Sequence, residues 1–130
     1  ARRPVSAVAL DSSSFIGHLN GRRGDDTLAV KAALDAGTAV LPPLVVTEVL
    51  SMPGLSAEVL HLVGVVTQLE VLPEYWERAG QLRADVIASG RRARTADVLI
   101  AQSCIDHGVA LITADTDFRF FVPHGLRLAL

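Results

Sequence analysis

Short runs of apolar residues alternate along the chain with longer segments in which apolar residues recur at helical spacing. We expect buried strands at residues 5–10, 38–41 and 109–113, and further short strands at 70–73 and 126–130. Because most of these runs are apolar throughout, the pattern indicates strands that are covered on both faces. Strands separated by helices predict an α/β fold built on a parallel sheet.

The helical segments lie between these strands, and several carry clear start or stop signals. Gly37, Gly90 and Gly108 are placed to end three helices, and Pro43 is placed to open another. The expected helices span residues 12–20, 26–37, 43–52, 56–69, 74–90 and 95–107.

The composition fits one folded domain over residues 1–130. Half of the residues are apolar, which argues against disorder, and this length is enough to bury a sizeable core. The net charge of -2 excludes a strong overall basic field. Of the 12 basic residues all but Lys31 are Arg, the side chain better suited to bidentate phosphate contacts.

Cysteine usage and the first residues bear on the compartment. The single Cys104 lies in an apolar helical pattern without a partner, which excludes a disulfide scaffold and favours a reducing cytoplasm. The first apolar run ends at Asp11 and is too short for a signal peptide core or a membrane span. We therefore expect a cytoplasmic protein with no membrane partner.

Acidic residues follow two of the expected strands. Asp11 comes after the strand at 5–10, and Asp115 and Asp117 come after the strand at 109–113. Ligands of open parallel sheets collect at the carboxyl ends of the strands, which is where these acids fall. Each acid also has a structural interpretation, with Asp11 as a helix N-cap and the later pair as part of a turn.

Two further acids lie on expected helices. Glu48 is the only charged residue from Ala36 to Ala57, and a carboxylate in so apolar a segment is costly unless it is paired or exposed. Asp97 falls in the first turn of a helix, where the helix dipole favours an acid and Thr95 is a plausible cap.

Taken together, these acids predict a cation site. Carboxylates gathered at one edge of a sheet repel one another, and some must take up protons unless a cation neutralises them. A ligand set made only of oxygen suits Mg²⁺ or Mn²⁺ better than Zn²⁺. One or two such ions can activate water and stabilise an in-line phosphoryl displacement.

Three segments carry a family resemblance, namely ALDSSSFI (9–16), LVVTEVL (44–50) and TADVLIAQSCIDHGVALITADTDF (95–118). In this order they resemble PIN-domain ribonucleases, and most closely the VapC-type toxins of prokaryotic toxin–antitoxin pairs. The resemblance extends over essentially the whole chain. It implies a three-layer α/β/α sandwich with a central, mostly parallel sheet.

The resemblance also assigns roles to the acids. Asp11, Glu48 and Asp97 match the three acids of the family motif, and Asp115 matches the fourth position. All four are therefore expected to be catalytic and to bind the metal. Asp117, the second acid of the Asp-x-Asp-Phe motif, is expected either to contact the metal or to cap the short helix that begins near Phe118.

Neighbouring polar residues complete the expected site. Ser12 and Thr113 adjoin the acids and would hydrogen-bond to carboxylates or to water at the metal. Arg91, Arg92 and Arg94 form the basic loop RRAR shortly before the third acid. The loop would bind RNA phosphates, and the alternative interpretation is a solvated helix end.

The resemblance implies an endoribonuclease that uses Mg²⁺ or Mn²⁺ and an activated water, leaving a 3′-hydroxyl and a 5′-phosphate. It further implies a homodimer that is held inactive by a small antitoxin protein. The alternative is a degenerate or non-toxin PIN domain that acts in RNA processing or as a binding module. A receiver-type phosphoacceptor domain is excluded because it needs a Lys after a late strand, whereas Lys31 lies in an early helix.

Overall fold

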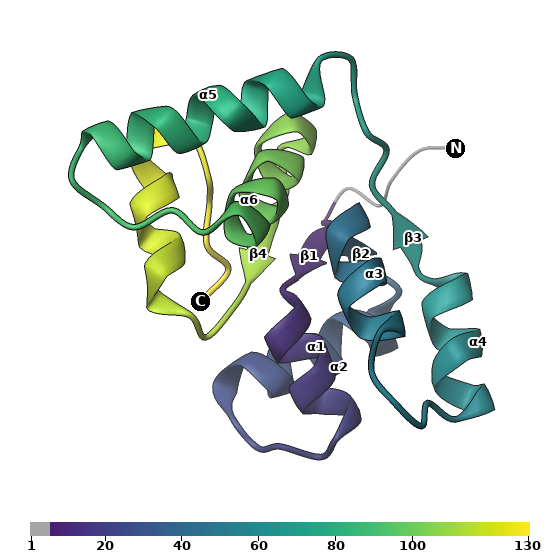
Figure 1. Cartoon of the computed structure of the whole chain (residues 1–130). Coiled ribbons are helices and arrows are strands. Elements are labelled where there is room, and N and C mark those ends of the chain that lie inside the picture. The colour runs from purple at the N-terminus through teal and green to yellow at the C-terminus, as the bar shows by residue number, and fades with distance from the viewer. Residues whose placement is uncertain (1–5) are drawn as a thin grey trace.

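The computed structural model describes residues 6–130, which form a four-stranded parallel sheet with helices on both sides (Figure 1). The strands are β1 (Val8–Leu10), β2 (Ala39–Leu41), β3 (Thr67–Gln68) and β4 (Ala110–Ile112). They lie in the order β3-β2-β1-β4, and every neighbouring pair is parallel. The predicted α/β fold with a parallel central sheet is confirmed.

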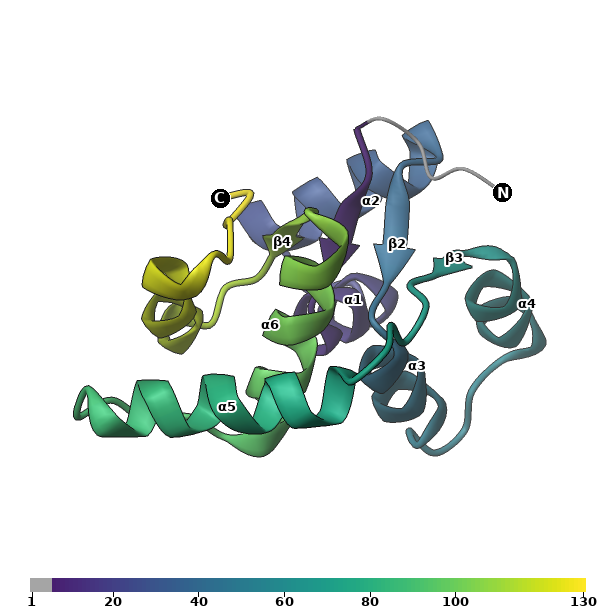
Figure 2. The same ribbon diagram turned by 90° about the horizontal axis from the view of Figure 1, so that it is seen from above.

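Helices cover the sheet on two sides. They are α1 (Ser12–Leu19), α2 (Asp25–Ala36), α3 (Pro43–Leu50), α4 (Ala57–Val65), α5 (Tyr75–Ala88), α6 (Thr95–His107) and the 3-10 helix η1 (Thr116–His124). α5 and α6 lie on one side of the sheet and α1 and α2 on the other, while α4 flanks β3 (Figures 1 and 2). Within residues 6–130, no helix is both long and apolar enough to cross a membrane.

The register of the sheet brings the ends of distant segments together. β1 is central, with Val8 opposite both Ala39 of β2 and Ala110 of β4. Beyond the last pair, the Asp11 N–H donates to the carbonyl oxygen of Ile112 at 3.0 Å. Because all strands run in the same direction, the segments that leave β1, β2 and β4 start at one edge of the sheet.

The core is built from the strands and from aromatic side chains of the flanking helices. Strand residues Leu10, Leu41 and Leu111 are fully buried, as expected for strands covered on both faces. Phe118 and Phe121 of η1 are also buried, and their ring centroids are 5.9 Å apart. η1 is therefore anchored to the core, which fixes the chain that follows β4.

The third strand lies earlier in the chain than predicted. The helix expected at 56–69 ends at Val65, and the strand expected at 70–73 is wrong because β3 consists of Thr67–Gln68. The buried Leu69 donates its N–H to the Leu41 carbonyl oxygen at 2.9 Å, which aligns the preceding residues with β2. Residues 70–71 are exposed and belong to the connection that follows.

The two ends of the chain also differ from expectation. The strand predicted at 5–10 begins at Val8, and Val5 lies outside the described residues. The strand predicted at 126–130 is reduced to one parallel bridge between Leu128 and Leu111. η1 extends to His124, so that only the last few residues can reach the free edge of β4.

A buried acid stabilises the turn between α1 and α2. Arg22 donates to both carboxylate oxygens of Asp26, at 2.6 and 3.2 Å, and Ser14 Oγ donates to the same carboxylate at 2.7 Å. Arg22 also lies against Gly17, where a Cβ atom would meet its guanidinium group at 2.6 Å. The hydrogen bonds from Arg22 lower the pKa of Asp26 to about 2, against the opposing effect of burial.

We predict that Asp26→Asn lowers the free energy of unfolding by about 1 kcal/mol at neutral pH, a figure reduced for the solvent screening of the half-exposed Arg22. Because the pKa of Asp26 is depressed in the folded protein, its contribution is present above about pH 4 and disappears as the pH falls towards 2. Urea titrations of Asp26→Asn and of the unaltered protein, at neutral pH and near pH 2, measure the change in the free energy of unfolding. The exposed neighbour Asp25, changed to Asn, serves as the control, and equal losses in both variants would contradict the prediction.

Candidate functional site

Asp11 lies at the carboxyl end of β1 and is only 5% exposed. It occupies the position before α1, but its side chain makes no capping hydrogen bond. Instead, its Oδ2 accepts hydrogen bonds from Thr113 Oγ1 at 2.7 Å and from Ser13 Oγ at 3.0 Å. The sequence did not single out Ser13, although it belongs to the Ser run that follows the acid.

Glu48 projects from α3, the helix that follows β2, and it is partly buried. The buried Ser12 donates from Oγ to Glu48 Oε1 at 2.7 Å. The simple interpretation of Glu48 as part of an exposed polar face therefore does not describe this side chain. The contact joins the start of α1 to α3 beside the sheet edge.

Asp97 lies in the first turn of α6, as the sequence predicted. The predicted cap is wrong, because Thr95 is already the first helical residue and Arg94 occupies the capping position. The pKa of Asp97 is raised to about 6, mainly by burial and then by the charges of Asp115 and Asp11. The charge of Arg94 acts in the opposite direction. This electrostatic interaction shows that acids from three distant segments lie near one another.

Asp115 and Asp117 follow β4 in different roles. Asp115 caps η1, since its Oδ1 accepts a hydrogen bond from the Asp117 N–H at 2.9 Å. The alternative in which Asp117 caps a helix near Phe118 is therefore wrong, because η1 begins at Thr116 with Asp115 as its cap. Asp117 lies in the first turn, partly buried, and its charge adds to the repulsion acting on Asp97.

Thr113 joins the ends of β1 and β4. Its hydroxyl donates to Asp11 and accepts the Asp115 N–H at 3.0 Å, so that one side chain positions both acids. Burial raises the pKa of Asp11, the hydrogen bonds from Thr113 and Ser13 lower it, and the charge of Asp115 raises it further. The net effect is an upward shift, so the ionised form of Asp11 is disfavoured here.

These carboxylates have the donor chemistry of a Mg²⁺ or Mn²⁺ site. All of them offer oxygen, and the pKa values of Asp11 and Asp97 are raised by burial and, to a lesser degree, by neighbouring acids, so that a cation would favour their ionised forms. Among residues 6–130, however, no three His, Cys, Asp or Glu side chains are positioned to hold a metal ion together. The residues fit the ion by chemistry and location, and they do not form a closed set of ligands as placed.

Two arginines of the RRAR loop lie close to these acids. Arg92 approaches Asp117, with 3.9 Å between Nη1 and Oδ2, and the charge of Arg94 lowers the pKa of Asp97. Arg91 lies instead over an aromatic ring of η1. The loop therefore places positive charge beside the acidic edge of the sheet.

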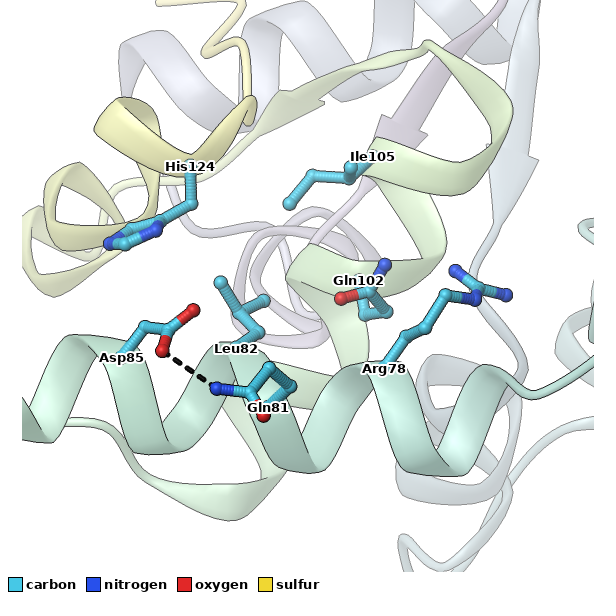
Figure 3. Close-up of a pocket in the computed structure, with 7 residues that line it drawn as sticks. All are labelled: Arg78, Gln81, Leu82, Asp85, Gln102, Ile105 and His124. Atoms are coloured by element: carbon cyan, nitrogen blue, oxygen red, sulfur yellow. Dashed lines mark hydrogen bonds between the residues drawn. The ribbon is translucent and has the colours of Figure 1, made fainter.

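A pocket of about 250 Å³ lies elsewhere, between α5, α6 and η1 (Figure 3). Its lining residues are Arg78, Gln81, Leu82, Asp85, Gln102, Ile105 and His124. Arg78 and Gln102 both donate to Asp106, which ties α5 to α6. None of the five predicted acids lines this pocket, so it is separate from the sheet-edge site.

Comparison with known protein families matches residues 8–120 to the PIN domain. The chain belongs to the PIN domain family. The fold of this PIN domain is similar to that of a chain in the crystal structure of VapBC2 from Rickettsia felis bound to a DNA fragment from its promoter. That match has a TM-score of 0.71 and 16% sequence identity, and it covers 94% of this chain and 96% of the other. No curated protein matches the sequence.

The burial of Asp97 beside other acids predicts an unusual effect on stability. Because the pKa of Asp97 is raised to about 6, its ionised form destabilises the metal-free fold above that pH and has no effect below about pH 4. We expect Asp97→Asn to raise the free energy of unfolding by about 1 kcal/mol near pH 8, after allowance for solvent screening, and to leave it unchanged near pH 4.

Thermal or urea unfolding in the presence of a chelator measures this change. The exposed Glu70, changed to Gln, provides a control for loss of a surface carboxylate. A loss of stability at pH 8 in Asp97→Asn would show that ionised Asp97 does not destabilise the fold as described.

Proposed function

We propose that this PIN domain is a Mg²⁺- or Mn²⁺-dependent endoribonuclease. The observation that carries the proposal is that the Thr113 hydroxyl holds Asp11 and Asp115 together at the carboxyl edge of the sheet. Asp97 lies near both acids, and its pKa is raised by burial and then by their charges. PIN domains are generally nucleases, and an acidic, oxygen-only edge beside arginines suits phosphodiester hydrolysis.

The acids of the sheet edge are the proposed ligands. Asp11, Asp97, Asp115 and Glu48 would hold the metal and act as the catalytic carboxylates, with Asp117 as a further ligand at the rim. When bound, the ion would act as a Lewis acid that lowers the pKa of water and neutralises charge on the phosphate. The products would be a 3′-hydroxyl and a 5′-phosphate.

Hydroxyl groups of the chain would position these carboxylates. Thr113 fixes one oxygen of Asp11 and supports the backbone of Asp115, and Ser12 fixes one oxygen of Glu48. Such contacts orient ligand oxygens and reduce the rearrangement needed when a cation binds. Among residues 6–130, no hydroxyl group donates to Asp97, and burial together with the charges of Asp115 and Asp11 raises its pKa, so a bound cation would stabilise its ionised form.

The RRAR loop is the proposed RNA-binding element. Arg91, Arg92 and Arg94 are exposed, and two of them lie beside the acids that would surround the scissile phosphate. An acidic site alone would repel RNA, whereas guanidinium groups at its rim would bind the phosphates on either side.

The nuclease proposal predicts that Asp11→Asn and Asp97→Asn each reduce Mn²⁺-dependent cleavage of a mixed-sequence RNA by at least about 100-fold. A chelator should abolish cleavage by the unaltered protein. Asp85→Asn, on the exposed face of α5, is the matched control and should retain activity. Persistent metal-dependent cleavage in either site variant would refute the assignment, and RNA binding without cleavage by the unaltered protein would favour a binding module.

We further propose that the nuclease is the toxin of a toxin–antitoxin pair. The structural likeness to a VapBC2 chain supports an antitoxin partner, and exposed apolar residues on α4 and α5, including Leu60, Val65 and Trp76, offer surface for that partner or for a homodimer. The lone, buried Cys104 supports a reducing cytoplasm as its compartment. A PIN domain that acts in RNA processing is the alternative function.

The toxin proposal predicts that expression of the chain in a bacterial host arrests growth, whereas the Asp97→Asn variant does not. Co-expression of a small protein encoded beside the chain should restore growth, and the two proteins should purify as a complex. An active nuclease that leaves growth unaffected, with no such neighbour, would instead support a role in RNA processing.

A further inference from the structure

We propose that Arg91, backed by Phe120, is a platform on which one unpaired RNA base stacks next to the acidic edge. This inference rests on the proposed ribonuclease function and names a residue that would bind one base of the substrate. It gives Arg91 a different role from the two arginines that follow it in the loop.

The contact between the two side chains is specific. The guanidinium carbon of Arg91 lies over the Phe120 ring at 5.5 Å from its centroid, within the range of a cation–π interaction. Phe120 is partly buried and packs against the core, so its ring is a fixed support. Arg91 is exposed, so a ligand in solution can reach its side chain.

The backbone below Arg91 is also fixed. Its own N–H donates to the Val86 carbonyl oxygen at 3.2 Å, and Arg83 Nε donates to the Ala93 carbonyl oxygen at 2.9 Å. Ala93 is buried within the same loop. The loop is thus held to α5 at two points, and Arg91 extends from an ordered segment towards η1.

The three loop arginines face different groups. Arg92 approaches Asp117, and Arg94 acts on Asp97, so both lie with carboxylates and suit the phosphates beside the cut. Arg91 lies over an aromatic ring, and because its guanidinium group is planar it suits the flat surface of a base. Proteins that recognise single-stranded RNA commonly stack unpaired bases on aromatic rings and on guanidinium planes.

The positions of Arg91 and Phe120 in the sequence also support a platform near the acids. Phe120 lies three residues after Asp117 in η1, and Arg91 is adjacent to Arg92, which approaches that same acid. The platform is therefore close to the acids in both segments that build it. A base held there would belong to a nucleotide near the scissile phosphate.

The test measures binding of a fluorescein-labelled single-stranded RNA of about ten nucleotides, in which one abasic site is moved through every position. The parent protein is Asp97→Asn with Mg²⁺ present, so that the RNA is not cut. At one position, loss of the base should raise the Kd about ten-fold. The ratio of the Kd for this abasic RNA to the Kd for the intact RNA reports stacking and does not depend on the total charge of the protein.

The variants separate stacking from charge and from packing. Arg91→Lys keeps the charge and Phe120→Leu keeps the apolar packing, and both should bring the ratio close to one. Phe120→Tyr should preserve the ratio. Arg119→Ala removes a neighbouring exposed arginine of η1 and should weaken all RNAs equally while leaving the ratio unchanged.

Two results would overturn the platform, namely no position dependence in the parent protein or an unchanged ratio in Arg91→Lys. If the unaltered protein cuts RNA and either result is found, the platform fails while the nuclease stands. If the unaltered protein neither cuts nor binds RNA, both proposals fail.

Discussion

The burial of carboxylates beside one another at one edge of the sheet is the constraint on which the rest of the structure depends. Burial and the charges of Asp115 and Asp11 raise the pKa of Asp97, so the acids resist being held together without a cation. A fold that keeps them there must supply the energy from elsewhere. The parallel sheet does so, because its register forces the segments after β1 and β4 to leave side by side.

Hydrogen bonds from small hydroxyl side chains stabilise these buried carboxylates. Thr113 bonds to Asp11 and Ser12 bonds to Glu48, and each contact satisfies a carboxylate oxygen that burial would otherwise leave without solvent. Behind them, Phe118 is fully buried and anchors η1 to the core. The stability of the apolar core therefore holds charged groups in positions that their own electrostatics oppose.

The sequence is informative where local chemistry and sheet geometry agree. Alternating apolar runs and helices predict a parallel sheet, and Asp11 and Asp115 can be placed at its edge because each comes shortly after a strand. Pairings between side chains could not be predicted from the sequence. Ser12 could have bonded to the adjacent Asp11, but it donates to Glu48, 36 residues away. β3 was misplaced for a similar reason, because its position depends on pairing with β2 and not on its own apolar pattern.

The net charge of the chain is close to zero, although the sheet-edge site contains several charged side chains. Acids and arginines occupy adjacent elements, with Arg92 beside Asp117 and Arg94 acting on Asp97, so that their fields largely cancel at a distance and remain strong locally. Such a surface does not attract nucleic acid through its overall charge. In the proposed nuclease, recognition would depend on short-range contacts that combine shape, stacking and single phosphates, and the RRAR loop is the segment proposed to provide them.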